Sequence, residues 1–158
     1  MDKDILIRIV LSIIICLLVG TIGSLATQSS IDTWYVGLMK PSWSPPNWIF
    51  APVWITLYIM MGIAAGIVWN RGFYHKWVKV ALYHFGIQLF LNGLWSIIFF
   101  GLEQPFFALL TICTLFILII FTIKWFNVVN KWSAILLIPY LLWVAFATAL
   151  NFEIWRLN

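Results

Sequence analysis

Charged side chains are scarce in this chain. They make up 9% of 158 residues, with nine Lys or Arg and five Asp or Glu, while 64% of the residues are hydrophobic. A soluble domain carries about 25% charged residues, so this chain has too little polar surface to cover a soluble globule. The lack of charge excludes a soluble domain and indicates that a lipid bilayer is the solvent.

Residues that carry catalytic or metal-binding chemistry are equally few. The chain has two histidines and two cysteines, and the cysteines, Cys16 and Cys113, both lie within apolar runs. Glu103 and Glu153 stand at the ends of such runs, and no acid pair, nucleophilic triad, phosphate loop or zinc spacing occurs. We therefore expect no metal and no resident cofactor. Without ionisable residues at mid-membrane depth, an ion pump is excluded as well.

Long apolar runs are what the chain does have. Each is close to the about 20 residues that a membrane-spanning helix needs, and in lipid a run of this length must be helical. The sequence predicts an all-α membrane protein, one domain over residues 1–158 that forms a five-transmembrane-helix bundle. The predicted spans are 5–27, 48–69, 77–100, 105–127 and 133–153.

The basic residues predict an orientation. Seven of the nine lie on the side that the N-terminus would share with the 70–76 and 128–132 loops, and only Lys40 and Arg156 lie on the other. The positive-inside rule places the N-terminus in the cytoplasm. The first run resembles a signal peptide with a small-residue site at Ser24 and Ala26, but its length favours a retained span. Dispersed juxtamembrane cations suit lipid headgroups, so we expect no nucleic-acid partner.

The longest connection, residues 28–47, combines stiffness with aromatic side chains. Its prolines and aromatics are Trp34, Tyr35, Pro41, Trp43, Pro45 and Pro46. Proline restricts the backbone, so the segment is predicted to lie as a lid over the outer end of the bundle. The alternative is a loop on the membrane surface with interfacial aromatic residues.

Polar and aromatic residues gather in the outer halves of three spans. They recur at helical spacing, which puts each set on one stripe. The stripes are Trp54, Tyr58 and Met61; Gln88, Asn92, Trp95 and Phe99; and Trp143, Ala147 and Asn151. Together they predict a pocket for a flat apolar ligand beneath the loop. The alternative is that Asn and Gln only link helices and that Trp only packs the core.

Small residues at a spacing of four occur in two spans. Gly62 and Gly66 form a GxxxG pair, and Ala145 and Ala149 have the same spacing. Such pairs allow helices to approach closely. We expect them to pack helices within the bundle.

Several motifs resemble a known family. They are the segment 40–46 (KPSWSPP), Val53-Trp54 with Leu57-Tyr58, Gln88 through Phe100, and Pro139 through Trp155. This combination, spread over nearly the whole chain, resembles the tryptophan-rich sensory protein family, also called the TspO/MBR family, which includes translocator protein or peripheral benzodiazepine receptor.

The resemblance implies a receptor for porphyrins and for benzodiazepine-type, drug-like apolar ligands. Some bacterial members are reported to break down protoporphyrin with light and oxygen, which makes Trp54 and Trp143 candidate catalytic residues. A proposed sterol motif of the family lacks its tyrosine here, where Phe152 stands, so we do not predict sterol binding. The stripes and the resemblance together predict these ligand-binding residues: Pro41, Trp43, Trp54, Tyr58, Gln88, Asn92, Trp95, Trp143, Phe146, Ala147, Leu150 and Asn151.

Three functions stay open at this point. The chain is expected to bind porphyrin in tetrapyrrole sensing or disposal, to degrade it, or, as the alternative, to transport porphyrin or sterol. No internal repeat supports transport. The basic-residue pattern and the absence of a targeting extension predict a bacterial cell membrane. Membrane lipid and a second copy of the chain in a homodimer are the other expected partners.

Overall fold

The computed structural model describes residues 3–158, and the described residues form helices and connecting turns without any strand. In chain order the elements are α1 (Lys3–Gln28), α2 (Trp34–Gly37), η1 (Asn47–Ile49), α3 (Phe50–Asn70), α4 (Lys76–Ser96), η2 (Ile97–Gly101), α5 (Pro105–Val129), α6 (Lys131–Leu136) and α7 (Ile138–Leu157). Five helical segments are long and apolar enough to cross a membrane, so the predicted all-α, five-span class is confirmed.

Two spans are less regular than the sequence indicated. The third ends in a π-helical turn, η2, which carries Phe99 and Phe100. The fifth is divided at Leu137 into α6 and α7, because Pro139 lacks a backbone N–H and its ring would meet the carbonyl of Ile135 in a continuous helix. Asn130 starts α6 by accepting a hydrogen bond from the Ser133 amide at 3.0 Å.

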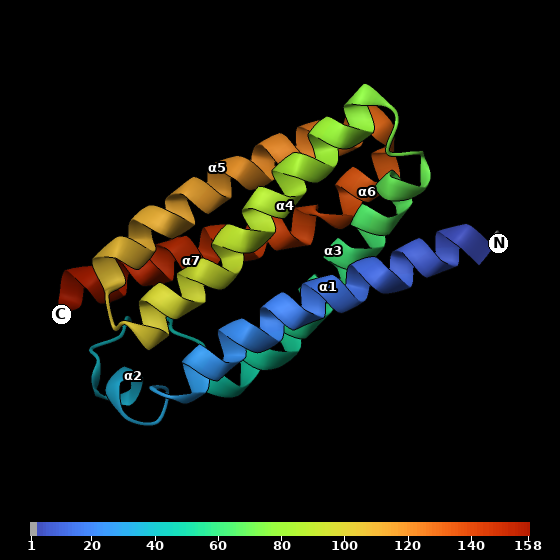
Figure 1. Ribbon diagram of the computed structural model, residues 1–158. Helices are drawn as coiled ribbons and strands as arrows, with labels where there is room; N and C mark the ends of the chain where they lie inside the picture. Colours follow the sequence, from blue (N-terminus) through green and yellow to red (C-terminus); the bar gives the residue numbers. More distant parts are fainter. Residues whose placement is uncertain (1–2) are drawn as a thin grey trace.

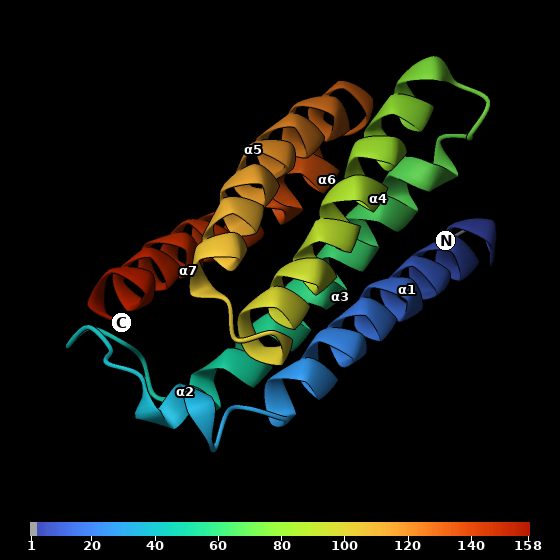
Figure 2. The ribbon, with the colours of Figure 1, turned by 60° about the vertical axis from the view of Figure 1, so that its left-hand side comes forward.

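The first two spans form the closest helix pair. A side chain on Gly62 or Gly66 would collide with the backbone of Ile13 or Ile9, so both glycines are required for the approach of α1 to α3. The prediction that this GxxxG pair packs helices within the bundle is confirmed. Figure 2 shows α1 lying along α3 over much of its length.

The helices form a ring in the order α1, α3, α6 with α7, α5 and α4, and α4 returns to α1. The N-terminal end of α1 lies at one end of the bundle, whereas α2 and the C-terminus lie at the other, which we call the loop end (Figure 1). Near the N-terminus, α3 packs against α6; toward the loop end, α7 packs against α5 and hardly touches α3. The interior is therefore wider at the loop end.

Candidate functional site

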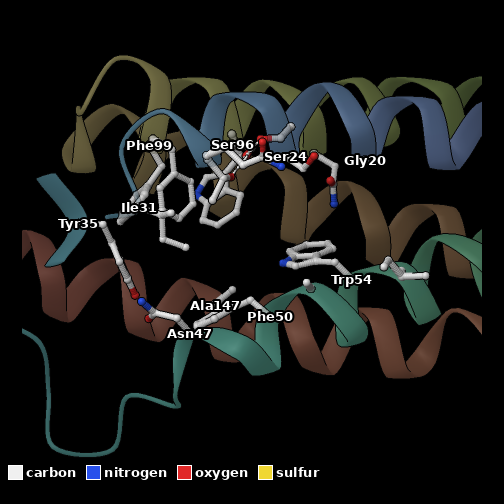
Figure 3. A pocket seen from close by; sticks show the side chains of 18 of the residues that line it. Gly20, Ser24, Ile31, Tyr35, Asn47, Phe50, Trp54, Ser96, Phe99 and Ala147 are labelled. Atoms are coloured by element: carbon white, nitrogen blue, oxygen red, sulfur yellow. Dashed lines mark hydrogen bonds between the residues drawn. The ribbon is translucent and has the colours of Figure 1, made fainter. Parts of the chain in front are cut away.

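A cavity of about 470 Å³ occupies this wider interior. Its wall comes from the loop-end halves of α1, α3 with η1, α4 with η2, and α7, and from the loop that contains α2 (Figure 3). The surface is mainly apolar. Seven of the twelve predicted ligand-binding residues line it, namely Trp54, Tyr58, Asn92, Trp95, Ala147, Leu150 and Asn151.

Trp54 is the central aromatic residue of the wall. Its indole ring stands in the cavity (Figure 3). The ring stacks on Tyr58 with centroids 5.7 Å apart and lies 6.3 Å from the Trp95 ring. Among the described residues the Trp54 N–H has no hydrogen-bond partner. Aromatic rings from two helices thus present flat apolar surface to whatever enters.

A buried polar chain forms the floor of the cavity. The Tyr58 hydroxyl donates to the Asn92 amide oxygen at 2.5 Å, and the Asn92 amide group donates to the Tyr140 hydroxyl at 2.9 Å. Tyr140 in turn donates to the Gln88 amide oxygen at 2.7 Å. Three helices are linked in this way. Gln88 lies behind the floor and does not reach the cavity.

A second polar link joins three helices nearer the loop end. The Trp95 indole N–H donates to the Asn151 amide oxygen at 3.0 Å, and the Asn151 amide group donates to the Pro105 carbonyl at 2.9 Å. The sequence left open whether the amide side chains link helices or line a pocket. Asn92 and Asn151 do both, because each links helices and each lines the cavity.

The loop that contains α2, with η1 after it, contributes to the wall at the loop end of the cavity. Ile31, Tyr35 and Asn47 belong to the wall. Tyr35 packs against Phe99 and Phe100, with centroid distances of 6.2 and 5.4 Å, and burial raises the pKa of its phenol. Its ring also lies beneath the Lys40 ammonium group, 4.5 Å away.

The far part of this loop is fastened to the end of α7. The Met39 amide donates to the Asn158 side-chain oxygen, and the Asn158 amide group donates back to the Met39 carbonyl, both at 3.0 Å. This reciprocal pair fixes the loop across the bundle.

Five predicted residues lie outside the wall, namely Pro41, Trp43, Gln88, Trp143 and Phe146. Three of them, Trp43, Phe146 and Trp143, form an aromatic row along α7. Trp43 meets Phe146 at 5.7 Å, Phe146 meets Trp143 at 5.3 Å, and Trp143 meets Phe50 at 5.9 Å. Phe50 is the member of the row that reaches the cavity. Trp143 packs against Phe50 but does not line the cavity itself, and its buried indole N–H has no partner among the described residues.

Sequence reasoning missed the contribution of α1. Gly20, Ser24 and Thr27 line the cavity at helical spacing. Ser24 and Thr27 donate to carbonyls of their own helix, at 3.0 Å in each case, so they add little free polarity. Small and hydroxyl residues at i, i+4 and i+7 in an otherwise apolar run were the available signal. Phe50 and Phe100 were also missed.

The chemistry of the wall is that of a binding site. Within residues 3–158 no group of three or more His, Cys, Asp or Glu side chains could hold a metal ion. The wall offers aromatic faces, a few amide and hydroxyl groups, and no carboxylate, imidazole or amine. A mainly apolar surface with a few polar groups is typical of small-molecule binding sites.

Comparison with known proteins agrees with this architecture. The TspO/MBR family matches residues 12–156. The chain is 46% identical to the tryptophan-rich protein TspO of Chlorobaculum tepidum, over 100% of this chain and 99% of that protein. It is 44% identical to the translocator protein of Homo sapiens, over 87% and 82% of the two chains, and 37% identical to protein CrtK of Rhodobacter capsulatus, over 90% and 88%. With this coverage, and with five helices able to span a membrane, the chain belongs to the TspO/MBR family of integral membrane proteins.

Proposed function

We propose that this protein is a membrane receptor that binds porphyrins, and drug-like apolar molecules of similar shape, in the loop-end cavity. The observation that carries the proposal is the Trp54 indole, which stands in the cavity beside Tyr58 and Trp95. The cavity volume of about 470 Å³ lies within the range of small-molecule sites, about 300–1,000 Å³.

The composition of the wall favours a flat, largely apolar ligand over a charged metabolite. Stacking on aromatic rings and burial of apolar surface would supply most of the binding free energy. The amide groups of Asn92 and Asn151 are already engaged in links between helices, so they are poorly placed to select a strongly polar ligand. The protein would thus act in tetrapyrrole sensing or disposal.

Binding is a better-supported activity than breakdown of the ligand. Light-dependent degradation was predicted to use Trp54 and Trp143 together. Trp143 does not line the cavity and packs against Phe50, which does. A molecule held in the cavity would therefore contact the Trp54 indole rather than that of Trp143. No contact or cavity among residues 3–158 specifically favours transport.

The setting of the receptor stays a prediction. We expect the cavity to open toward the outside of a bacterial cell membrane with the N-terminus in the cytoplasm, because the basic residues gather at the N-terminal end of the bundle. A homodimer is likewise expected.

The proposal is tested by titrating the detergent-purified protein with protoporphyrin in the dark and following quenching of tryptophan fluorescence. Each base stacked on an aromatic ring is worth about 1–3 kcal/mol in nucleic-acid sites, and by analogy Trp54→Ala should weaken binding about tenfold. Trp132, which is 70% exposed on α6, gives the matched control. Trp132→Ala should leave the affinity unchanged.

A second arm separates binding from breakdown. Porphyrin absorbance is followed under light with the wild type and with Trp143→Phe, which keeps a ring but loses the indole. We expect no protein-dependent loss of absorbance beyond that of free porphyrin. Loss that requires Trp143 would establish an enzyme instead. Equal affinity of wild type and Trp54→Ala would show that the cavity is not the binding site.

A further inference from the structure

A second recess lies on the lipid-facing side of the bundle, away from the cavity. It is an apolar groove of about 190 Å³ in the N-terminal half, lined by Ser12, Ile15, Ala65, Trp69, Leu82, Phe85, Gly86 and Leu89. These residues come from α1, α3 and α4, and none of them lines the loop-end cavity. Its rims, Ile15 and Gly86, are exposed, so the groove faces lipid.

Glycine keeps the groove open. A side chain at Gly86 would meet no atom within 4 Å, so this position is empty space and its glycine is not required for helix packing. Gly62 and Gly66 differ in this respect, because side chains there would strike α1. Gly86 therefore leaves this part of the groove unfilled on the lipid-facing side of α4.

Both rims of the groove end in a cation at the same membrane face. On α1, Arg8 is one turn before Ser12, and on α4, Lys79 is one turn before Leu82. Figures 1 and 2 show that α1 and α4 both run from the N-terminal end of the bundle toward the loop end. Each cation precedes the lining residues of its own helix, so the two lie toward the same end of the groove. The remaining lining residues are apolar apart from Ser12.

Arg8 lies at the end of the groove and keeps unused hydrogen-bond donors. It donates to the Trp69 carbonyl at 3.2 Å, and its guanidinium lies 5.9 Å from the centre of the Trp69 ring. A guanidinium has several further N–H donors, and within residues 3–158 no carboxylate makes an ion pair with it. Lys79 is exposed. Tryptophan and arginine together at a helix end are typical of the headgroup level.

We propose that this groove binds one anionic phospholipid, with an acyl chain along Ile15, Gly86 and Leu89 and the phosphate between Arg8 and Lys79. From Arg8 to Ile15 the groove follows about 10 Å of helix axis, roughly a third of the hydrocarbon thickness, so it holds the headgroup-proximal part of a chain. An acyl chain is the occupant because the groove faces lipid. The headgroup is anionic because the two cations Arg8 and Lys79 outnumber the carboxylate of Asp4, which is exposed one turn before Arg8 on α1.

The test is native mass spectrometry of the detergent-purified full chain with phosphatidylglycerol or phosphatidylcholine. We expect the wild type to retain phosphatidylglycerol in preference. Arg8→Gln with Lys79→Gln should reduce that preference about thirtyfold, since each surface cation contributes about 1 kcal/mol toward anionic lipid. Gly86→Leu should remove adducts of both lipids, because the leucine side chain fills the groove. The substitution should not disturb α4, since leucine favours a helix more than glycine does.

The matched control is Lys124→Gln, an exposed lysine at the same end of the bundle that lies over Trp125 on α5. It should leave the preference unchanged, and porphyrin quenching should be normal in all variants as a check of folding. If Arg8→Gln does not accumulate, Lys79→Gln alone should give about a fivefold loss.

Three results would overturn the proposal. An equal loss in Lys124→Gln would show diffuse attraction to the whole face. Persistence of phosphatidylglycerol adducts in Gly86→Leu would show that no chain enters the groove. Equal retention of the two lipids by the wild type would show that the cations do not select a headgroup.

Discussion

The two halves of the bundle are built from the same five spans but fill their interiors in opposite ways. In the N-terminal half, small and aliphatic side chains such as Ala64, Val68, Ala81 and Ile119 are fully buried and leave the core closed. In the loop-end half, the interior is lined by indole, phenol and phenyl rings around a cavity of about 470 Å³. Small side chains let helices meet, whereas large stiff rings supported by their neighbours leave space between them.

The change from closed to hollow takes place at two features at similar depth. The hydrogen-bonded chain of Tyr58, Asn92, Tyr140 and Gln88 crosses the bundle as the floor. The break at Leu137 lets α6 pack on α3 while α7 follows α5. The cavity is therefore a consequence of one helix break and one polar layer.

The strongest contrast should come from the same substitution made in each half. Ala64→Leu adds volume where there is no space, so it should lower the free energy of unfolding by about 1–3 kcal/mol. Ala147→Leu adds it to the cavity wall and should cost less than about 1 kcal/mol while weakening porphyrin binding. Denaturant titration in detergent micelles measures both. Equal destabilisation by the two variants would contradict the conclusion that one half is closely packed and the other hollow.

The floor is expected to give the next largest effect. Tyr140→Phe removes one hydroxyl that accepts from Asn92 and donates to Gln88, so two buried amide groups lose a partner. The expected loss in the free energy of unfolding is about 1–2 kcal/mol. Tyr83→Phe is the control, because Tyr83 is 60% exposed on the same bundle. A Tyr140→Phe protein as stable as the control would mean that the floor does not hold the halves together.

The smallest effect should come from the fastening of the loop. Asn158→Ala removes both hydrogen bonds to Met39 at an exposed site, so the free energy of unfolding should change by no more than about 0.5 kcal/mol. The loop would open more often, and porphyrin should dissociate faster with little change in stability. Stopped-flow measurement of dissociation checks this. An unchanged dissociation rate would show that the fastening does not control access.

Much of the site could be predicted because helical spacing fixes which side chains share a face. Trp54 and Tyr58, like Asn92 and Trp95, are separated by about one helical turn and line the cavity as expected. The same reasoning placed Trp143 and Gln88 there, and both lie behind the wall. Spacing gives the direction of a side chain from its own helix, but not where the neighbouring helices lie around it.

The sequence by itself determined the membrane as solvent, five helical spans and the stripes of aromatic residues, because apolar run length and helical periodicity are local properties. Only the tertiary structure decided which helices meet. It brought Gly20 and Ser24 of α1 into the wall, fastened Met39 to Asn158 across 119 positions of the chain, and left Trp143 outside the wall against Phe50. These outcomes depend on where the break at Leu137 directs α7 and on how closely Gly62 lets α1 approach α3. Such distances between helices are set by packing of side chains far apart in the sequence.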